Sequence, residues 1–306
     1  MSNKILSKDD LKIFKGKSYL PWFPSPRKKG SPQNPKKVVV FDLDETLGSF
    51  ADLYILWCGV RQVWPMCDRF NDLLDTYPEF LRYGILTILE YLYDAKIKRI
   101  CHKIFVYTNN QCSTQWVHMI ADYFQMKVQS IYDEPPIPSM KLFDQKICAF
   151  KINNQPIESF RTSHQKRLDD FFRCSTISEN ADICFVDDVE YPFMKGSKVY
   201  YICPRAYLHN LRTTEIIRRI AKAPWLPPDP AYSLLHSEDY WHNWFYLHKR
   251  RLMRRGQSDL LLDLQISQKM IYHLQEFLHH KVKPNTRQTL KNRVYRHSKT
   301  TTRKRR

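Results

Sequence analysis

The stretch Lys37-Val38-Val39-Val40-Phe41-Asp42-Leu43-Asp44-Glu45-Thr46-Leu47 decides how this chain folds. Its run from Val38 to Phe41 has no polar residue, which predicts a strand buried on both faces, as in a parallel sheet with helices on each side. Asp42 falls at the carboxyl end of that strand, where open α/β sheets bind their ligands. Side chains alternate along an extended chain, so Asp42 and Asp44 are predicted to face one site. An acidic turn would explain the pair if it stood alone.

Two later apolar runs also end in polar residues. Residues 103–107 read as a buried strand followed by Thr108, and residues 183–186 as another followed by Asp187 and Asp188. A Thr ahead of a helix N-terminus can offer its hydroxyl and nearby backbone N–H groups to an anion, although a plain helix cap is the alternative. Adjacent carboxylates suit Mg²⁺, which prefers oxygen ligands, although a β-turn starting with two Asp is the alternative.

Together these runs resemble the motifs of the haloacid dehalogenase superfamily. The sequence Asp-Leu-Asp-Glu-Thr-Leu at 42–47 is similar to the first motif of its FCP/SCP-type branch, phosphatases that act on the C-terminal domain of RNA polymerase II and similar phosphoproteins. The Leu47-Gly48 continuation is similar to members encoded by large DNA viruses. The resemblance covers about 36–205 and implies a Rossmann-like α/β fold, with a parallel sheet and helices on both faces.

The resemblance also implies a Mg²⁺-dependent phosphoric monoester hydrolase. Asp42 would be the nucleophile that forms an aspartyl-phosphate, and Asp44 the acid and base. The Mg²⁺ ligands would be the Asp42 carboxylate, the Asp44 backbone carbonyl and the Asp187/Asp188 pair. Within that pair, Asp188 would be the direct ligand and Asp187 a second or water-mediated partner.

Two further residues would balance the charge of the phosphoryl group. Thr108 is similar to the second motif of the superfamily, which binds that group. A Lys shortly before an amphipathic helix is similar to the third motif, and Lys166 is the residue we choose. Arg161 and Arg167 lie close enough in the sequence to compete for this role, and spacing does not separate them.

The two positions where this superfamily carries a cap hold only short inserts here. Residues 49–81 are rich in aromatic residues, and residues 130–160 contain β-prone pieces that suggest a hairpin. Neither is long enough to fold as an independent lid, so we predict an open cleft in which Trp57 or Trp64 stacks on the prolines of a peptide. Between the inserts, apolar spacing predicts an amphipathic helix over 84–96.

Composition divides the chain into four parts. We predict a proline-rich basic arm at 1–35, the phosphatase-like domain at 36–223, a helical extension at 224–280 and a disordered basic tail at 281–306. The extension reads as two helices, most simply a hairpin packed on the domain. The tail holds eleven Lys and Arg and no acidic residue, which leaves +7 of the total charge of +18 for the rest of the chain.

The sequence allows more than one substrate and more than one location. A phosphoserine or phosphothreonine protein, such as the polymerase C-terminal domain, is the expected partner. The basic charge keeps a nucleic-acid end phosphatase as an alternative, with nucleic-acid contact through the tail, and a non-catalytic binding module is the other. No apolar run of about 18 residues and no signal pattern is present, so an intracellular location is expected, in the nucleus or a viral factory. The sequence does not indicate an oligomeric state.

Overall fold

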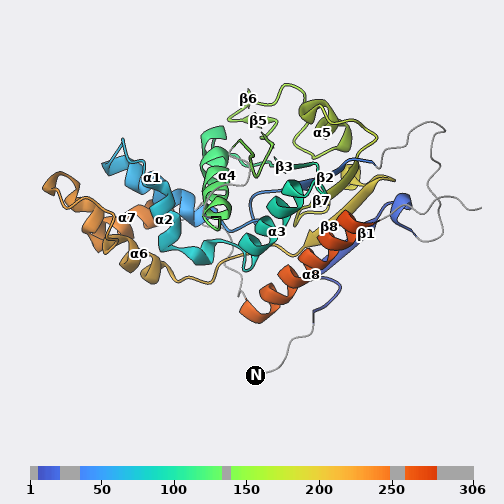
Figure 1. The fold of residues 1–306 in the computed structure, drawn as a ribbon. Coiled ribbons are helices and arrows are strands. Elements are labelled where there is room, and N and C mark those ends of the chain that lie inside the picture. Colours follow the sequence, from blue (N-terminus) through green and yellow to red (C-terminus); the bar gives the residue numbers. More distant parts are fainter. Residues whose placement is uncertain (1–5, 21–34, 133–138, 249–258, 281–306) are drawn as a thin grey trace, which may run out of the picture.

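A computed structural model describes residues 6–20, 35–132, 139–248 and 259–280 of the chain. Its centre is a six-stranded sheet in the order β1-β8-β7-β2-β3-β4 (Figure 1). All neighbours pair in parallel except β1, which is antiparallel to β8. In chain order the strands are β1 (Leu11–Lys15), β2 (Lys37–Phe41), β3 (Lys103–Tyr107), β4 (Gln145–Ile147), β7 (Asp182–Val186) and β8 (Val199–Pro204).

Helices cover both faces of the sheet, as the apolar run in β2 predicts. Val39 and Phe41 point into a core shared with α3 (Ile85–Ile97), α4 (Thr114–Gln129) and α8 (Leu260–His279). Val38 and Val40 point to the opposite face, where α5 (Leu168–Ser175) covers them. The structure is therefore an α/β fold with a mostly parallel sheet, and helix α3 confirms the amphipathic pattern predicted for 84–96.

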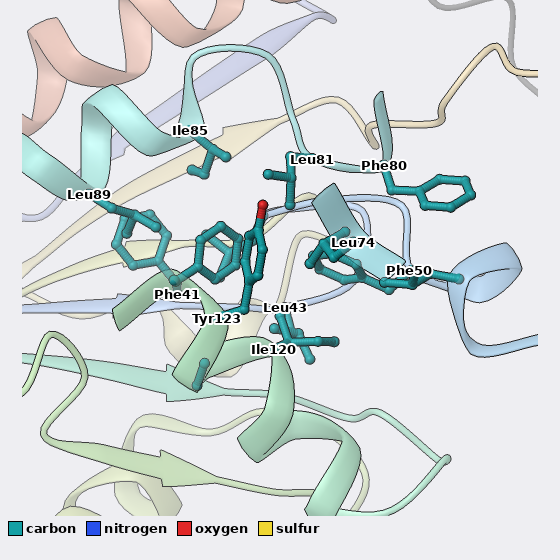
Figure 2. Packing of buried hydrophobic residues seen from close by; sticks show 14 of the residues in the cluster. Phe41, Leu43, Phe50, Leu74, Phe80, Leu81, Ile85, Leu89, Ile120 and Tyr123 are labelled. Carbon is teal, nitrogen blue, oxygen red and sulfur yellow. The ribbon is translucent and has the colours of Figure 1, made fainter. Parts of the chain in front are cut away.

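The larger core continues from the sheet into the first insert. Figure 2 shows Phe41 and Leu43 packed among Leu89 of α3 and Ile120 of α4, with Phe50 of the insert close by. The insert forms α1 (Ala51–Val63) and α2 (Phe70–Thr76), followed by the 3-10 helix η2 (Pro78–Phe80). It has no separate core, in agreement with its short length.

Helical segments from the C-terminal part of the chain pack on the insert and cover it. Helices α6 (Thr213–Ala221) and α7 (Glu238–His248) and the 3-10 helix η4 (Pro230–His236) pack against α1 and α2, as seen at the left of Figure 1. The approach is close, because a Cβ on Gly59 would lie 2.5 Å from Trp241. Trp244 also donates a hydrogen bond to the Ile55 carbonyl over 2.9 Å.

Two expectations about the ends of the chain need correction. The arm predicted for 1–35 includes β1, an edge strand of the sheet, and the 3-10 helix η1 (Lys17–Tyr19). The two C-terminal helices are present, but α7 packs on the insert, whereas α8 packs on α3 and β8. They are therefore not a hairpin docked as one unit.

The remaining expectations are met in part. The hairpin predicted within 130–160 consists of β5 (Lys151–Ile152) and β6 (Gln155–Pro156), while β4 joins the main sheet instead. A further 3-10 helix, η3 (Pro192–Met194), follows β7. The basic tail at 281–306 lies outside the described residues. Within the described ranges, no helix is both long and apolar enough to cross a membrane.

Candidate active site

The register of the sheet brings two of the predicted acids together. Phe41 of β2 pairs with Val186 of β7, and the Asp42 amide donates to the Val186 carbonyl over 2.9 Å. The next residue on each strand, Asp42 and Asp187, therefore leaves the sheet beside the other. Asp188 completes the group, in which each residue offers a carboxylate oxygen and these atoms lie within 4.8 Å of one another.

Lys166 supplies the positive charge of this cluster. It lies in the loop before α5, and its ammonium donates to Asp42 Oδ1 and, over 2.6 Å, to Asp187 Oδ2. The Lys166 side chain is 1% exposed. Burial opposes the charge on its amine, but the attraction of Asp187 and Asp42 outweighs burial and raises the pKa of Lys166. The lysine therefore stays charged beside the predicted nucleophile.

The two arginines that compete with Lys166 in the sequence occupy other positions. Arg161 is buried, and its guanidinium donates to the backbone carbonyls of Thr108 and Cys148 over 2.9 and 2.7 Å. It thereby ties the ends of β3 and β4 together. The Arg167 guanidinium instead lies 4.2 Å from the centre of the Phe193 ring. Of the three, Lys166 is the one that contacts the acidic cluster.

Asp44 lies next to the cluster, and its hydrogen-bond partner is Asn110 rather than Lys166. Its Oδ2 accepts a hydrogen bond from the Asn110 side chain over 2.8 Å. Burial and the neighbouring charge of Asp42 raise the pKa of Asp44 to about 7, against the opposing effect of Asn110. A carboxyl group with such a pKa can hold a proton near neutral pH and can exchange it with a bound ligand. Asn110 follows the predicted Thr108 by two residues, but the sequence gives it no role.

Thr108 stands at the end of β3, as predicted, and is buried. Its hydroxyl oxygen accepts a hydrogen bond from the Asn110 amide over 3.0 Å, which shapes the turn that presents Asn110 to Asp44. The helix that follows is capped by Ser113, whose hydroxyl accepts from the Trp116 amide. The alternative of a plain helix cap at Thr108 is therefore wrong.

The loop after β2 is held by two residues that received no role from the sequence. Thr46 donates its hydroxyl to Asp188 Oδ1 over 2.8 Å and accepts from the Asp188 amide over 3.0 Å. Arg82 donates to the carbonyls of Glu45 and Thr46 over 2.5 and 2.6 Å. Glu45 sits at a φ of 55°, so this turn is tight and depends on its partners. Because Arg82 binds backbone carbonyls, no pattern of side chains in the sequence identifies its supporting role.

The acidic cluster fits a divalent cation of the magnesium type. The donors are carboxylate oxygens, which is the ligand chemistry that Mg²⁺ prefers. After the contacts to Lys166 and Thr46, Asp42 Oδ2 and Asp188 Oδ2 have no hydrogen-bond partner among the described residues. Burial and the charge of Asp42 raise the pKa of Asp188 to about 6, so a cation bound nearby would favour its ionised form.

The rim of the site differs from the expected aromatic walls. Trp57 is buried against Phe70 within the insert, and Trp64 packs on Tyr232. The stacking role predicted for Trp57 is therefore wrong. Instead, Val189 and Phe193, on the segment that follows the Asp187–Asp188 pair, are about half exposed.

Comparisons with known proteins give no relative on which to base a function. No protein family, curated protein or solved structure matches the chain. The geometry of the acidic cluster and its motifs is therefore the basis on which a function can be argued.

Proposed function

We propose that the chain is a Mg²⁺-dependent phosphatase of the haloacid dehalogenase type that hydrolyses phosphomonoesters through an aspartyl-phosphate. The contact between Lys166 and Asp42 at the carboxyl end of β2 is the observation that carries this proposal. The buried Lys166 pairs with Asp42, which suits the role of nucleophile. The second acid, Asp44, has a raised pKa, which suits the role of proton donor. The resemblance of residues 42–47, Thr108 and Asp187–Asp188 to the superfamily motifs supports the same function.

In the first half of the proposed reaction, Asp42 attacks the phosphorus atom. A bond forms from a carboxylate oxygen of Asp42 to phosphorus as the bond to the leaving oxygen breaks. Asp44 gives its proton to that leaving oxygen, so the alcohol departs neutral. Lys166 offsets the negative charge of the phosphoryl group as it approaches the anionic Asp42.

In the second half, water attacks the aspartyl-phosphate. Asp44, now ionised, accepts a proton from the water, and the bond between phosphorus and Asp42 breaks to release inorganic phosphate. Burial and the charge of Asp42 raise the pKa of Asp44, which suits a group that serves as acid and then as base. Asn110 keeps the Asp44 carboxyl oriented through its hydrogen bond in both steps.

The carboxylates of Asp42, Asp187 and Asp188 would hold Mg²⁺, together with the backbone carbonyl of Asp44. The bound ion would neutralise negative charge on the phosphoryl oxygens. Thr46 fixes the orientation of Asp188, which suits the role of Asp188 as a direct ligand. Asp187 is engaged by Lys166 and by the Val189 amide, which suits a supporting role.

We further propose a phosphoserine or phosphothreonine peptide as the substrate. Neither insert is built as an independent lid, because the first shares the main core and the second contributes a short hairpin. A site without a lid must draw specificity from contacts that flank the phosphate. Exposed Val189 and Phe193 provide an apolar surface for residues beside a phosphoserine.

Hydrolysis of an aryl phosphate with and without Mg²⁺ tests the proposal. Wild-type protein is expected to release phosphate only with the metal, and Asp42→Asn to lose at least about a thousandfold in kcat with an unchanged fold. Asp68→Asn is the matched control, because Asp68 is an exposed aspartate outside the site. A folded Asp42→Asn variant that loses much less than this in kcat would remove the nucleophile assignment.

Three substrates then separate the function classes. A phosphoserine peptide, a 3′-phosphorylated oligonucleotide and a 5′-phosphorylated oligonucleotide are compared at equal concentration. The peptide is expected to be the preferred substrate. Preference for either oligonucleotide would indicate a nucleic-acid end phosphatase, and no turnover of any of the three would leave a binding module.

A further inference from the structure

Helix α8 reaches the loop that carries the candidate site residues. Ser267 of α8 donates its hydroxyl to the Tyr83 carbonyl, and a Cβ on Gly84 would lie 3.1 Å from the Ser267 Cβ. Gly84 has a φ of 76°, so the chain turns sharply here against the helix. This turn begins with Arg82, the residue that holds the loop after β2. Helix α8 thus contacts Tyr83, the residue next to Arg82, and Arg82 supports the candidate site.

Arg82 is a buried cation whose contacts are mostly to neutral atoms. Its guanidinium donates to the carbonyls of Glu45, Thr46 and Arg205, the last over 2.9 Å. The side chain is almost fully buried, yet its Nη1 has no hydrogen-bond partner among the described residues. A buried charge of this kind is costly without a counterion.

Asp263 of α8 presents the complementary problem. It is 1% exposed, and its Oδ1 accepts from Arg205 over a long 3.4 Å. Its Oδ2 is buried and has no hydrogen-bond partner among the described residues. The carboxylate and the Arg82 guanidinium both contact Arg205, Asp263 through the Arg205 side chain and Arg82 through its carbonyl. Arg82 Nη1, a donor, and Asp263 Oδ2, an acceptor of opposite charge, therefore both lack a hydrogen-bond partner among the described residues, and both side chains lie around Arg205.

We propose that Asp263 is a positioning residue for the candidate active site, acting as the counterion that holds Arg82 on the loop of residues 42–47. One buried water between the Asp263 carboxylate and Arg82 Nη1 would satisfy both unpaired atoms. Arg82 in turn fixes the Glu45 and Thr46 carbonyls, and Thr46 fixes Asp188. The extension beyond residue 223 thereby becomes part of the site's support. This role deepens the proposed phosphatase function, but the contacts themselves do not depend on it.

Amide hydrogen exchange measured by mass spectrometry tests the proposal without reference to catalysis. In Asp263→Asn, the peptide covering 42–48 is expected to exchange about tenfold faster than in the wild type, with α3 and β8 unchanged. Glu276→Gln is the matched control, because it alters contacts of the same helix with Lys15 and Tyr200, away from the turn at Arg82, and its 42–48 peptide should stay within about twofold of the wild type. Unchanged exchange at 42–48 in Asp263→Asn, or equal acceleration in Glu276→Gln, would overturn the role.

The Arg82→Lys variant tests the path through Arg82. It keeps the charge but loses the planar fork that reaches two carbonyls, so its 42–48 peptide should also exchange faster. Because Asp263 acts through Arg82, Asp263→Asn should accelerate exchange at 42–48 less in the Arg82→Lys background than in the wild type. Additive effects would show independent structural roles and overturn the proposal. If Asp263→Asn fails to fold, unchanged exchange at 42–48 in Arg82→Lys has the same consequence.

Kinetics add a second readout that separates this inference from the proposed function. On an aryl phosphate, Asp263→Asn should lower kcat about tenfold and leave KM within about twofold, because the substrate does not touch Asp263. A change in KM alone would contradict a positioning role. If the wild type hydrolyses no phosphomonoester, the proposed function fails, while hydrogen exchange still decides the role of Asp263.

Discussion

Lys166 and Asp42 are 124 positions apart in the chain, yet the ammonium of one donates a buried hydrogen bond to the carboxylate of the other. The contact neutralises part of the charge of three clustered carboxylates. It also places a cation where the proposed phosphoryl group must approach an anionic nucleophile. Lys166 therefore has two effects that can be measured separately, one on stability and one on turnover.

The Lys166→Met variant should lose hydrolysis of an aryl phosphate by about a hundredfold or more, because the charge that offsets the phosphoryl group is gone. The remaining carboxylates then repel one another, so Mg²⁺ should raise the melting temperature more in the variant than in the wild type. Thermal unfolding with and without Mg²⁺ measures the second effect. An equal rise in both proteins would argue against a metal at these carboxylates.

The Lys37→Met variant should lower the free energy of unfolding by about 2 kcal/mol, a typical contribution of hydrogen bonds to a charged group. Lys37 donates to the carbonyls of Phe277, Leu278 and His280 over 2.6 to 2.9 Å and so closes the C-terminal end of α8. Lys36→Met is the matched control, because Lys36 is exposed. Urea unfolding of the two variants compares them, and equal stability would remove the capping role.

The Phe193→Ser variant should lower kcat/KM for a phosphoserine peptide by about tenfold and leave hydrolysis of an aryl phosphate nearly unchanged. The physical reason is the loss of about 1.4 kcal/mol of contact with residues that flank the phosphate. Phe193 is 52% exposed beside Arg167, so its removal should not disturb the core. An equal loss on both substrates would place the effect on the reaction itself.

The wild-type protein should hydrolyse a phosphoserine peptide with a kcat/KM about a hundredfold above that for free phosphoserine or a sugar phosphate. An open site gains little from the phosphate alone, so flanking contacts must supply the difference. Steady-state kinetics on the three substrates measures the ratio. Equal or better catalysis on a small metabolite would contradict both the open site and the protein substrate.

Deleting residues 281–306 should leave aryl phosphate hydrolysis unchanged and weaken binding to nucleic acid. The segment carries eleven Lys and Arg and no acidic residue, so it should contribute a salt-dependent, sequence-independent attraction. Binding of a labelled oligonucleotide at two salt concentrations measures the effect. A deletion that lowers the melting temperature sharply would assign the segment a structural role instead.

The sequence was most informative where apolar strands meet polar ends. Mostly apolar runs predict strands β2, β3 and β7, and the acids that follow β2 and β7 do converge. A buried strand must be apolar along its length, so an acid at its end stands out. The choice among Arg161, Lys166 and Arg167 needed the structure, because spacing along a loop does not determine which side chain turns inward.

The sequence was least informative where packing partners come from distant segments. Strand β1 is an edge strand with partly exposed residues, so its short sequence has no clear apolar pattern, and the proline-rich residues that follow it favour an extended arm. Helical periodicity indicated that α7 and α8 each bury a face, but not which surface covers that face. The supporting role of Arg82 has no sequence pattern of its own, because its partners are backbone carbonyls, which every residue has.

The position of α8 has a consequence for how the chain is made. Asp42, Lys166 and Asp187 all precede α8, so a ribosome completes them well before it adds Asp263 and the rest of that helix. Until then, the sheet face formed by residues such as Tyr200 lacks its cover, and the nascent chain exposes apolar surface. A fragment that stops at residue 223 should therefore aggregate rather than fold as a working domain, and refolding of the full chain should be slow, since its contacts span most of its length.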